Sequence, residues 1–137
     1  MTALIDSGFF YATHDRRDGN HSRVIHALSG LDDSLVLPTG VLVEVGYLLQ
    51  ARIGHHAMRD MIDRLKNGPI PLQPLFQADL ERISEILSEY ADGKLDFVDA
   101  AITAMAERLN IRKILTVDQR GFRMIRPKHC DYFEIFP

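Results

Sequence analysis

Two short apolar runs in this chain each stop abruptly at an aspartate. Ala3-Leu4-Ile5 is followed by Asp6, and Ile114-Leu115-Thr116-Val117 is followed by Asp118. Short apolar runs bounded by polar residues are typical of strands that are buried on both faces of a parallel sheet. Because ligands gather at the carboxyl ends of such strands, we expect both aspartates to point into one crevice.

Segments with helical periodicity separate the apolar runs. We predict helices over residues 7–13, 20–31, 41–53, 55–66, 77–90 and 97–109, and strands over residues 2–5, 35–37, 70–75, 113–117, 122–125 and 132–136. The helix over 41–53 carries apolar residues nearly all round, so we expect it to be largely buried. Strands that alternate with helices predict an α/β fold, a three-layer sandwich with a mainly parallel central sheet.

Chain length and cysteine content set the broad class. The 137 residues suit a single domain, residues 1–137, with one hydrophobic core. The lone Cys130 has no partner for an internal disulfide, which favours a reducing compartment. With no signal-peptide pattern and no apolar stretch approaching ~18 residues, we expect a cytoplasmic protein without membrane attachment.

Two further acids stand in conspicuous places: Glu44 lies within an apolar helical segment, and Asp99 opens the helix over 97–109. Clustered carboxylates repel one another and raise each other's pKa unless a cation compensates their charge. Mg²⁺ or Mn²⁺ suits oxygen ligands, whereas zinc favours histidine or cysteine. We therefore consider Asp6, Glu44, Asp99 and Asp118 as candidate catalytic residues and metal ligands.

Each of these acids also has an ordinary structural role open to it. Asp96 and Asp99 fall at the cap and third positions of a helix, where carboxylates accept free backbone N–H bonds, and for either alone capping is the simpler interpretation. Asp6 could equally cap a helix, Asp118 could begin a turn, and Glu44 could form an ion pair with an arginine. Taken together, however, these ordinary roles have to explain all four acids at once.

The local motifs around these acids resemble a known family. In chain order they are Leu4-Ile5-Asp6-Ser7, Val43-Glu44-Val45, Asp96-Phe97-Val98-Asp99-Ala100-Ala101-Ile102 and Leu115-Thr116-Val117-Asp118-Gln119-Arg120-Gly121-Phe122. Together they strongly resemble a PIN domain of the VapC-type toxin ribonucleases. The resemblance covers nearly the whole chain.

The resemblance implies a metal-dependent endoribonuclease that hydrolyses RNA phosphodiester bonds with Mg²⁺ or Mn²⁺. Acids at Asp6, Glu44, Asp99 and Asp118 would form its active site, with Asp6 and Asp99 the most direct metal ligands. The matched small polar residues, Ser7 and Thr116, could orient a water or a carboxylate, and turn or strand chemistry is the alternative role for both.

The resemblance also implies the toxin of a type II toxin–antitoxin pair, with RNA as substrate, a cognate small antitoxin as partner and a homodimer as the assembly. A groove near Phe9, Phe10 and Tyr11 and the segment 41–49 could receive an amphipathic antitoxin helix. The alternative function is a non-catalytic RNA-binding or regulatory module with the same fold. Neither the RNA target nor the antitoxin is encoded in any motif of the chain.

Charge is unevenly placed along a chain whose net charge is −3. Residues 108–128 hold seven basic residues and one acid, whereas residues 79–99 hold seven acids and two basic residues. The basic segment flanks Asp118 and could hold a phosphate backbone, with solvated surface charge as the alternative. The six histidines show no paired metal spacing, and we interpret them as surface or core residues.

Overall fold

The computed structural model describes all 137 residues and contains a five-stranded sheet in the order β3-β2-β1-β4-β5. Every neighbouring pair of strands is parallel. The strands are β1 (Thr2–Ile5), β2 (Ser34–Pro38), β3 (Leu72–Gln73), β4 (Lys113–Leu115) and β5 (Glu134–Phe136). The predicted parallel sheet of an α/β fold is therefore confirmed.

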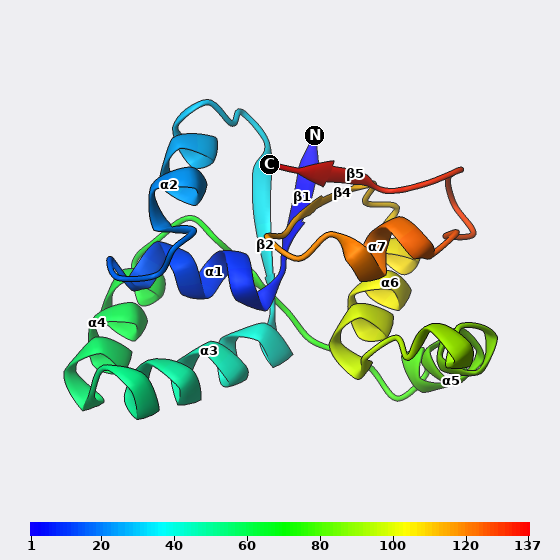
Figure 1. Cartoon of the computed structure of the whole chain (residues 1–137), viewed down its shortest axis with the longest axis horizontal. Helices are drawn as coiled ribbons and strands as arrows, with labels where there is room; N and C mark the ends of the chain where they lie inside the picture. Colours follow the sequence, from blue (N-terminus) through cyan, green and yellow to red (C-terminus); the bar gives the residue numbers. More distant parts are fainter.

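Helices cover the sheet on both sides. In Figure 1, α1 to α4 lie on one side of the strands and α5 to α7 on the other, which gives the predicted three layers. The helices are α1 (Ser7–His14), α2 (His21–Ser29), α3 (Thr39–Arg52), α4 (His55–Lys66), α5 (Asp79–Glu89), α6 (Phe97–Leu109) and α7 (Arg120–Met124), with a 3₁₀ turn η1 (Ala91–Gly93) before α6.

Strand β1 occupies the centre of the sheet, with β2 on one side and β4 on the other. The chain winds outward from β1 through β2 to β3, then returns to the opposite side of β1 for β4 and β5. This reversal is a topological switch point, where a crevice opens at the carboxyl ends of the strands. Asp6 directly follows β1, and Thr116 directly follows β4.

Apolar residues on β1 and on the inner faces of the helices form the core. Ala3, Leu4 and Ile5 are almost fully buried, and so is every residue from Ala100 to Ala106 in α6. The alanines of α6 let it pack closely against Ile83 and Ile86 of α5. None of the helices combines the length and the apolar character that a membrane span requires.

The predicted strand over residues 122–125 is wrong. Those residues belong mostly to helix α7, which buries Phe122 in the core from a helical turn. Residues 122–125 are apolar except for Arg123, and so short a segment suits either a strand or one turn of helix, because it has no measurable period. The predicted strand over residues 70–75 is shorter than expected, since only Leu72 and Gln73 pair with β2 at the edge of the sheet.

The expectation that the helix over residues 41–53 is largely buried is also wrong. Helix α3 buries only Val41, Val45 and Leu49, which recur every fourth residue on one face. Val43 and Tyr47 on another face are 67% and 72% exposed. In Figure 1, α3 lies along the lower edge of the α1–α4 layer with α1 above it, so part of its apolar surface is not covered by other elements.

Candidate acidic metal site

Asp6 lies where β1 passes into α1. Its Oδ1 accepts a hydrogen bond from the Ser7 backbone N–H at 2.8 Å, so the carboxylate caps α1. Its Oδ2 accepts one from the Thr116 hydroxyl, also at 2.8 Å. The parallel register that pairs Ile5 with Leu115 brings these two residues together. Capping, one of the roles that the sequence left open for Asp6, is confirmed, and its other carboxylate oxygen lies beside the end of β4.

Glu44 reaches the same end of the sheet from α3. The Ser7 hydroxyl donates a hydrogen bond to Glu44 Oε2 at 2.6 Å, which ties α3 to the start of α1. The carboxylate is exposed and makes no ion pair with an arginine, so the alternative role suggested for it is absent. Ser7 therefore orients a carboxylate, one of the two roles predicted for it.

Helix α6 contributes two acids from its first turn. Asp96 is its cap, because Asp96 Oδ1 accepts a hydrogen bond from the Asp99 backbone N–H at 2.9 Å. Both carboxylates also line a cavity of about 180 Å³ together with Asp118. Asp118 is exposed, and its Oδ1 accepts the Arg120 backbone N–H at 3.3 Å, which is the turn predicted as its alternative role.

Gly121 is a site residue that the sequence analysis missed. It lies on α7 and lines the cavity beside Asp99, and a Cβ at this position would overlap Asp99 Oδ2. The absence of a side chain is therefore what allows α7 and the Asp99 carboxylate to share this space. In the sequence, Gly121 merely resembles the end of a turn that begins at Asp118.

Burial raises the pKa of two of these carboxyl groups, and the neighbouring carboxylates add to the effect. Burial, with the charges of the neighbouring acids as a second cause, raises the pKa of Asp99 to about 8. Burial also raises the pKa of Asp6 to about 6, against the opposing effect of its hydrogen bonds from Thr116 and Ser7. We call the five interacting acids, Asp6, Glu44, Asp96, Asp99 and Asp118, the acidic cluster.

No lysine, arginine or histidine forms an ion pair with any member of the acidic cluster. The structure also does not bring three histidine, cysteine, aspartate or glutamate side chains together around a single metal position. The donor chemistry still fits a hard divalent cation, because the cluster offers only oxygen atoms and none of its carboxylates forms an ion pair with a protein cation. The metal site of Asp6, Glu44, Asp99 and Asp118 remains a prediction.

Most of the basic segment over residues 108–128 does not face the acidic cluster. Arg108 pairs with Asp79 at 2.9 Å, and Lys113 pairs with Asp33 at 2.8 Å. Only Arg120 of this segment lines the cavity that holds Asp99 and Asp118. The phosphate-binding role of the segment remains a prediction, for which Arg120 has the nearest position to the acidic cluster by lining this cavity with Lys94.

Three of the six histidines have their contacts outside the acidic cluster. His21 Nδ1 and His129 Nε2 each lie 2.6 Å from a backbone carbonyl oxygen, those of Ala12 and Ile111. Burial lowers the pKa of His14 to about 4, with the charge of Arg64 as a second cause. None of the three contributes to the candidate site, in agreement with the sequence analysis.

Comparison with known proteins agrees with this architecture. The family profile described as PIN domain matches residues 3–126. Ribonuclease VapC26 of Mycobacterium tuberculosis (strain ATCC 25618 / H37Rv) is 30% identical over 134 residues, which cover 98% of this chain and 99% of that protein.

Solved structures show the same fold. The crystal structure of M. tuberculosis VapC20, described as a Sarcin-Ricin loop cleaving toxin, superposes with a TM-score of 0.82 at 18% identity, covering 98% of this chain and 99% of that one. A toxin–antitoxin complex from Klebsiella pneumoniae superposes with a TM-score of 0.67 at 20% identity, covering 90% of this chain and 92% of that one.

Proposed function

The chain belongs to the PIN-domain family, and on that basis we propose that it is a metal-dependent endoribonuclease acting as the toxin of a type II toxin–antitoxin pair. The observation that carries the proposal is the acidic cluster at the switch point of the sheet. The pKa values of Asp6 and Asp99 are both raised within this cluster, and neither carboxylate forms an ion pair with a protein cation. Such a site binds a cation that the chain itself does not supply.

The chemistry of the donors favours Mg²⁺ or Mn²⁺ as that cation. Asp6 and Asp99 would be the most direct ligands, with Glu44 and Asp118 completing the set. When bound, the ion lowers the pKa of a water and offsets charge on the phosphodiester. The four acids come from four separate segments of the chain, so the proposed site depends on the tertiary fold.

The residues around the carboxylates hold them in position. Thr116 and the Ser7 backbone fix both oxygens of Asp6, and the Ser7 hydroxyl fixes Glu44. Asp99, with a pKa of about 8, retains a proton at neutral pH while no cation is present. Cation binding would displace that proton, because a positive charge beside the carboxylate favours its ionised form.

Incubation of the purified protein with total RNA tests the activity. We expect cleavage with Mg²⁺ or Mn²⁺ and none with EDTA. Asp6→Asn and Asp99→Asn should each abolish cleavage while circular dichroism stays that of the folded wild type, because each change removes a ligand charge and preserves side-chain shape. Undiminished cleavage in EDTA would exclude a metal nuclease, whereas RNA binding without cleavage at any metal concentration would favour the non-catalytic module.

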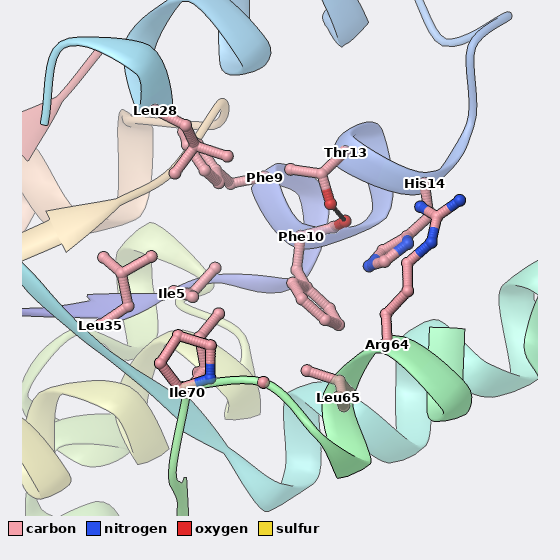
Figure 2. Close-up of a pocket in the computed structure, with 12 residues that line it drawn as sticks. Ile5, Phe9, Phe10, Thr13, His14, Leu28, Leu35, Arg64, Leu65 and Ile70 are labelled. Atoms are coloured by element: carbon pink, nitrogen blue, oxygen red, sulfur yellow. Dashed lines mark hydrogen bonds between the residues drawn. The ribbon is translucent and has the colours of Figure 1, made fainter. Parts of the chain in front are cut away.

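An antitoxin partner has a candidate contact site on the α1–α4 layer. Phe9, Phe10 and Tyr11 are all buried, so they do not themselves present an exposed surface to a partner. Phe9 and Phe10 instead line an apolar cavity of about 190 Å³, which Leu28 and Leu65 border (Figure 2). An apolar side chain of an amphipathic antitoxin helix is the occupant that we propose for this cavity.

Expression in cells tests the antitoxin proposal. The wild type should arrest growth, and co-expression of the small protein encoded beside it should relieve the arrest. Leu28→Lys places a charge at the cavity and should preserve toxicity but prevent neutralisation, whereas His26→Lys on the same helix should behave as the wild type. Equal neutralisation of both variants would place the antitoxin elsewhere.

A second copy of the chain is the partner that we propose for the exposed face of α3. Val43 and Tyr47 lie one helical turn apart on this face and are both largely exposed. Light scattering of the wild type should give the mass of a dimer, and Tyr47→Glu should give that of a monomer. A monomeric wild type at micromolar concentration would contradict the assignment.

A further inference from the structure

A second polar cavity, with a volume of about 590 Å³, lies on the α1–α4 layer away from the acidic cluster. It opens where the end of α1 meets the junction of α3 and α4. We call it the basic groove, and its lining residues are His14, Asp15, Arg16, Arg17, Arg52, Ile53, His56, Ala57, Asp60 and Arg64.

The four arginines of the basic groove are not paired with acids of the fold. None of their guanidinium groups makes an ion pair with a carboxylate, and all four are exposed residues. By contrast, Arg82 donates to both oxygens of Glu107, and Arg108 donates to both oxygens of Asp79. Guanidinium groups that share one cavity and lack a carboxylate partner are available to bind an anion.

Charge in the basic groove is opposite to that of the rest of the chain. Four arginines and two aspartates give the lining a formal charge of +2, while the whole chain carries −3. One of the aspartates, Asp15, accepts a hydrogen bond from the Tyr11 hydroxyl at 2.5 Å. The guanidinium of Arg52 lies over the ring of that tyrosine, 4.9 Å from its centre, and this contact holds the side chain at the groove.

Helices α1 and α3 connect the basic groove to the acidic cluster. Nearer the amino ends of the two helices, the Ser7 hydroxyl of α1 donates a hydrogen bond to Glu44 of α3. Farther along the same two helices, the Arg52 guanidinium of α3 lies over the Tyr11 ring of α1. The two helices run side by side in Figure 1. Eight residues separate Glu44 from Arg52, which corresponds to about 12 Å along a helix axis.

We propose that the basic groove binds the phosphate backbone of single-stranded RNA on one side of the bond cleaved at the acidic cluster. The inference rests on the proposed nuclease function. A stacked strand rises ~3.4 Å per nucleotide, so about three or four nucleotides span the separation between Glu44 and Arg52. The acidic cluster itself repels phosphates, and the groove adds its uncommitted positive charge to that of Lys94 and Arg120, which line the acidic cavity.

RNA binding measured in EDTA separates the groove from catalysis. The probe is a fluorescein-labelled single-stranded RNA of roughly 12 nucleotides, long enough to reach from the cluster to the groove, followed by anisotropy at several salt concentrations. Arg16→Gln/Arg17→Gln/Arg52→Gln should bind about tenfold more weakly at low salt, and the slope of log K against log salt should fall by ~0.7 for each phosphate that the variant no longer neutralises.

A matched control removes the same charge outside the groove. Arg23→Gln/Arg59→Gln/Lys66→Gln changes three exposed basic residues that do not line it, and should retain wild-type affinity and slope. Equal weakening by both triple variants would reduce the effect to net charge and overturn the proposal. An unchanged affinity of the groove variant for RNA would also overturn the proposal. This includes the outcome in which the groove variant loses antitoxin binding alone.

Cleavage kinetics with Mg²⁺ give the second readout. For the longer RNA, the groove variant should raise KM with kcat unchanged, because the groove binds ground and transition states alike. For a dinucleotide, which cannot reach the groove, kcat/KM should equal that of the wild type. An equal loss of kcat/KM on both substrates would overturn the proposal. If the wild type cleaves no RNA at all, the nuclease function is contradicted instead, and the anisotropy measurement in EDTA still decides whether the groove binds RNA.

Discussion

The Asp99 carboxylate occupies the space that a side chain on Gly121 would fill. A Cβ built on this glycine overlaps Asp99 Oδ2, although the two residues lie on different helices, α6 and α7. The glycine therefore sets how closely α7 approaches a proposed metal ligand. Its role is one of positioning, because it has no side-chain group that could contact RNA or metal.

Gly121→Ala should displace the Asp99 carboxylate and lower cleavage at least tenfold, while the chain remains folded. A displaced ligand weakens metal binding, so part of the activity should return at higher Mn²⁺ concentration. Gly30→Ala is the control, since a Cβ at Gly30 meets nothing within 4 Å. Activity assays across a Mn²⁺ titration check the prediction, and wild-type activity of Gly121→Ala at low metal would contradict it.

Thr116→Val should move the pH profile of cleavage. Valine preserves shape but loses the hydroxyl that donates to Asp6 Oδ2, and this hydrogen bond is one of the interactions that hold the pKa of Asp6 down. The acid limb of kcat/KM against pH should shift to higher pH, and Thr116→Ser should restore it. A uniform loss of activity at all pH values would indicate a purely structural role for the threonine.

The metal-free protein should become less stable as the pH rises from about 5 to about 8. The folded-state pKa values of Asp6, about 6, and Asp99, about 8, exceed the ordinary value of 3.8, so the folded chain holds more protons than the unfolded chain in this range. The free energy of unfolding therefore falls with pH. Calorimetry in EDTA checks this: Asp99→Asn should show a weaker pH dependence of Tm, and a parallel dependence would contradict the assignment.

The sheet and the position of Asp6 could be predicted because their signal is local, whereas Asp118 lies three residues beyond the end of β4 and does not directly follow a strand as expected. An apolar run that ends at a carboxylate indicates both the strand and the position of the acid at its end, and the parallel pairing of Ile5 with Leu115 then places Asp6 beside Thr116. Glu44 was singled out for a partly wrong reason. The helix that carries Glu44 is not largely buried, yet the Glu44 carboxylate accepts a hydrogen bond from Ser7, the residue next to Asp6.

The basic groove could not be predicted because its residues share no pattern. Arg16 and Arg17 follow α1, Arg52 ends α3 and Arg64 lies on α4, so only the tertiary packing assembles them. The basic residues over 108–128 are conspicuous in the sequence because they lie close together, but only Arg120 of them lines the acidic cavity. Its Arg108 and Lys113 are paired with acids that lie far away in the sequence.

The two aspartates at the start of α6 should respond in opposite ways to truncation. Asp96 caps the helix through the Asp99 N–H, so Asp96→Ala should cost about 1 kcal/mol of stability and leave most of the activity. Asp99 caps nothing, and burial raises the pKa of its carboxyl group, so Asp99→Ala should abolish cleavage with little loss of stability. Urea unfolding and RNA cleavage, measured on the same preparations, check both. Asp96 and Asp99 both line the acidic cavity, so the two substitutions decide which of these carboxylates binds the metal. If Asp96→Ala stops cleavage in a folded protein while Asp99→Ala retains it, Asp96 rather than Asp99 is the metal ligand of this helix.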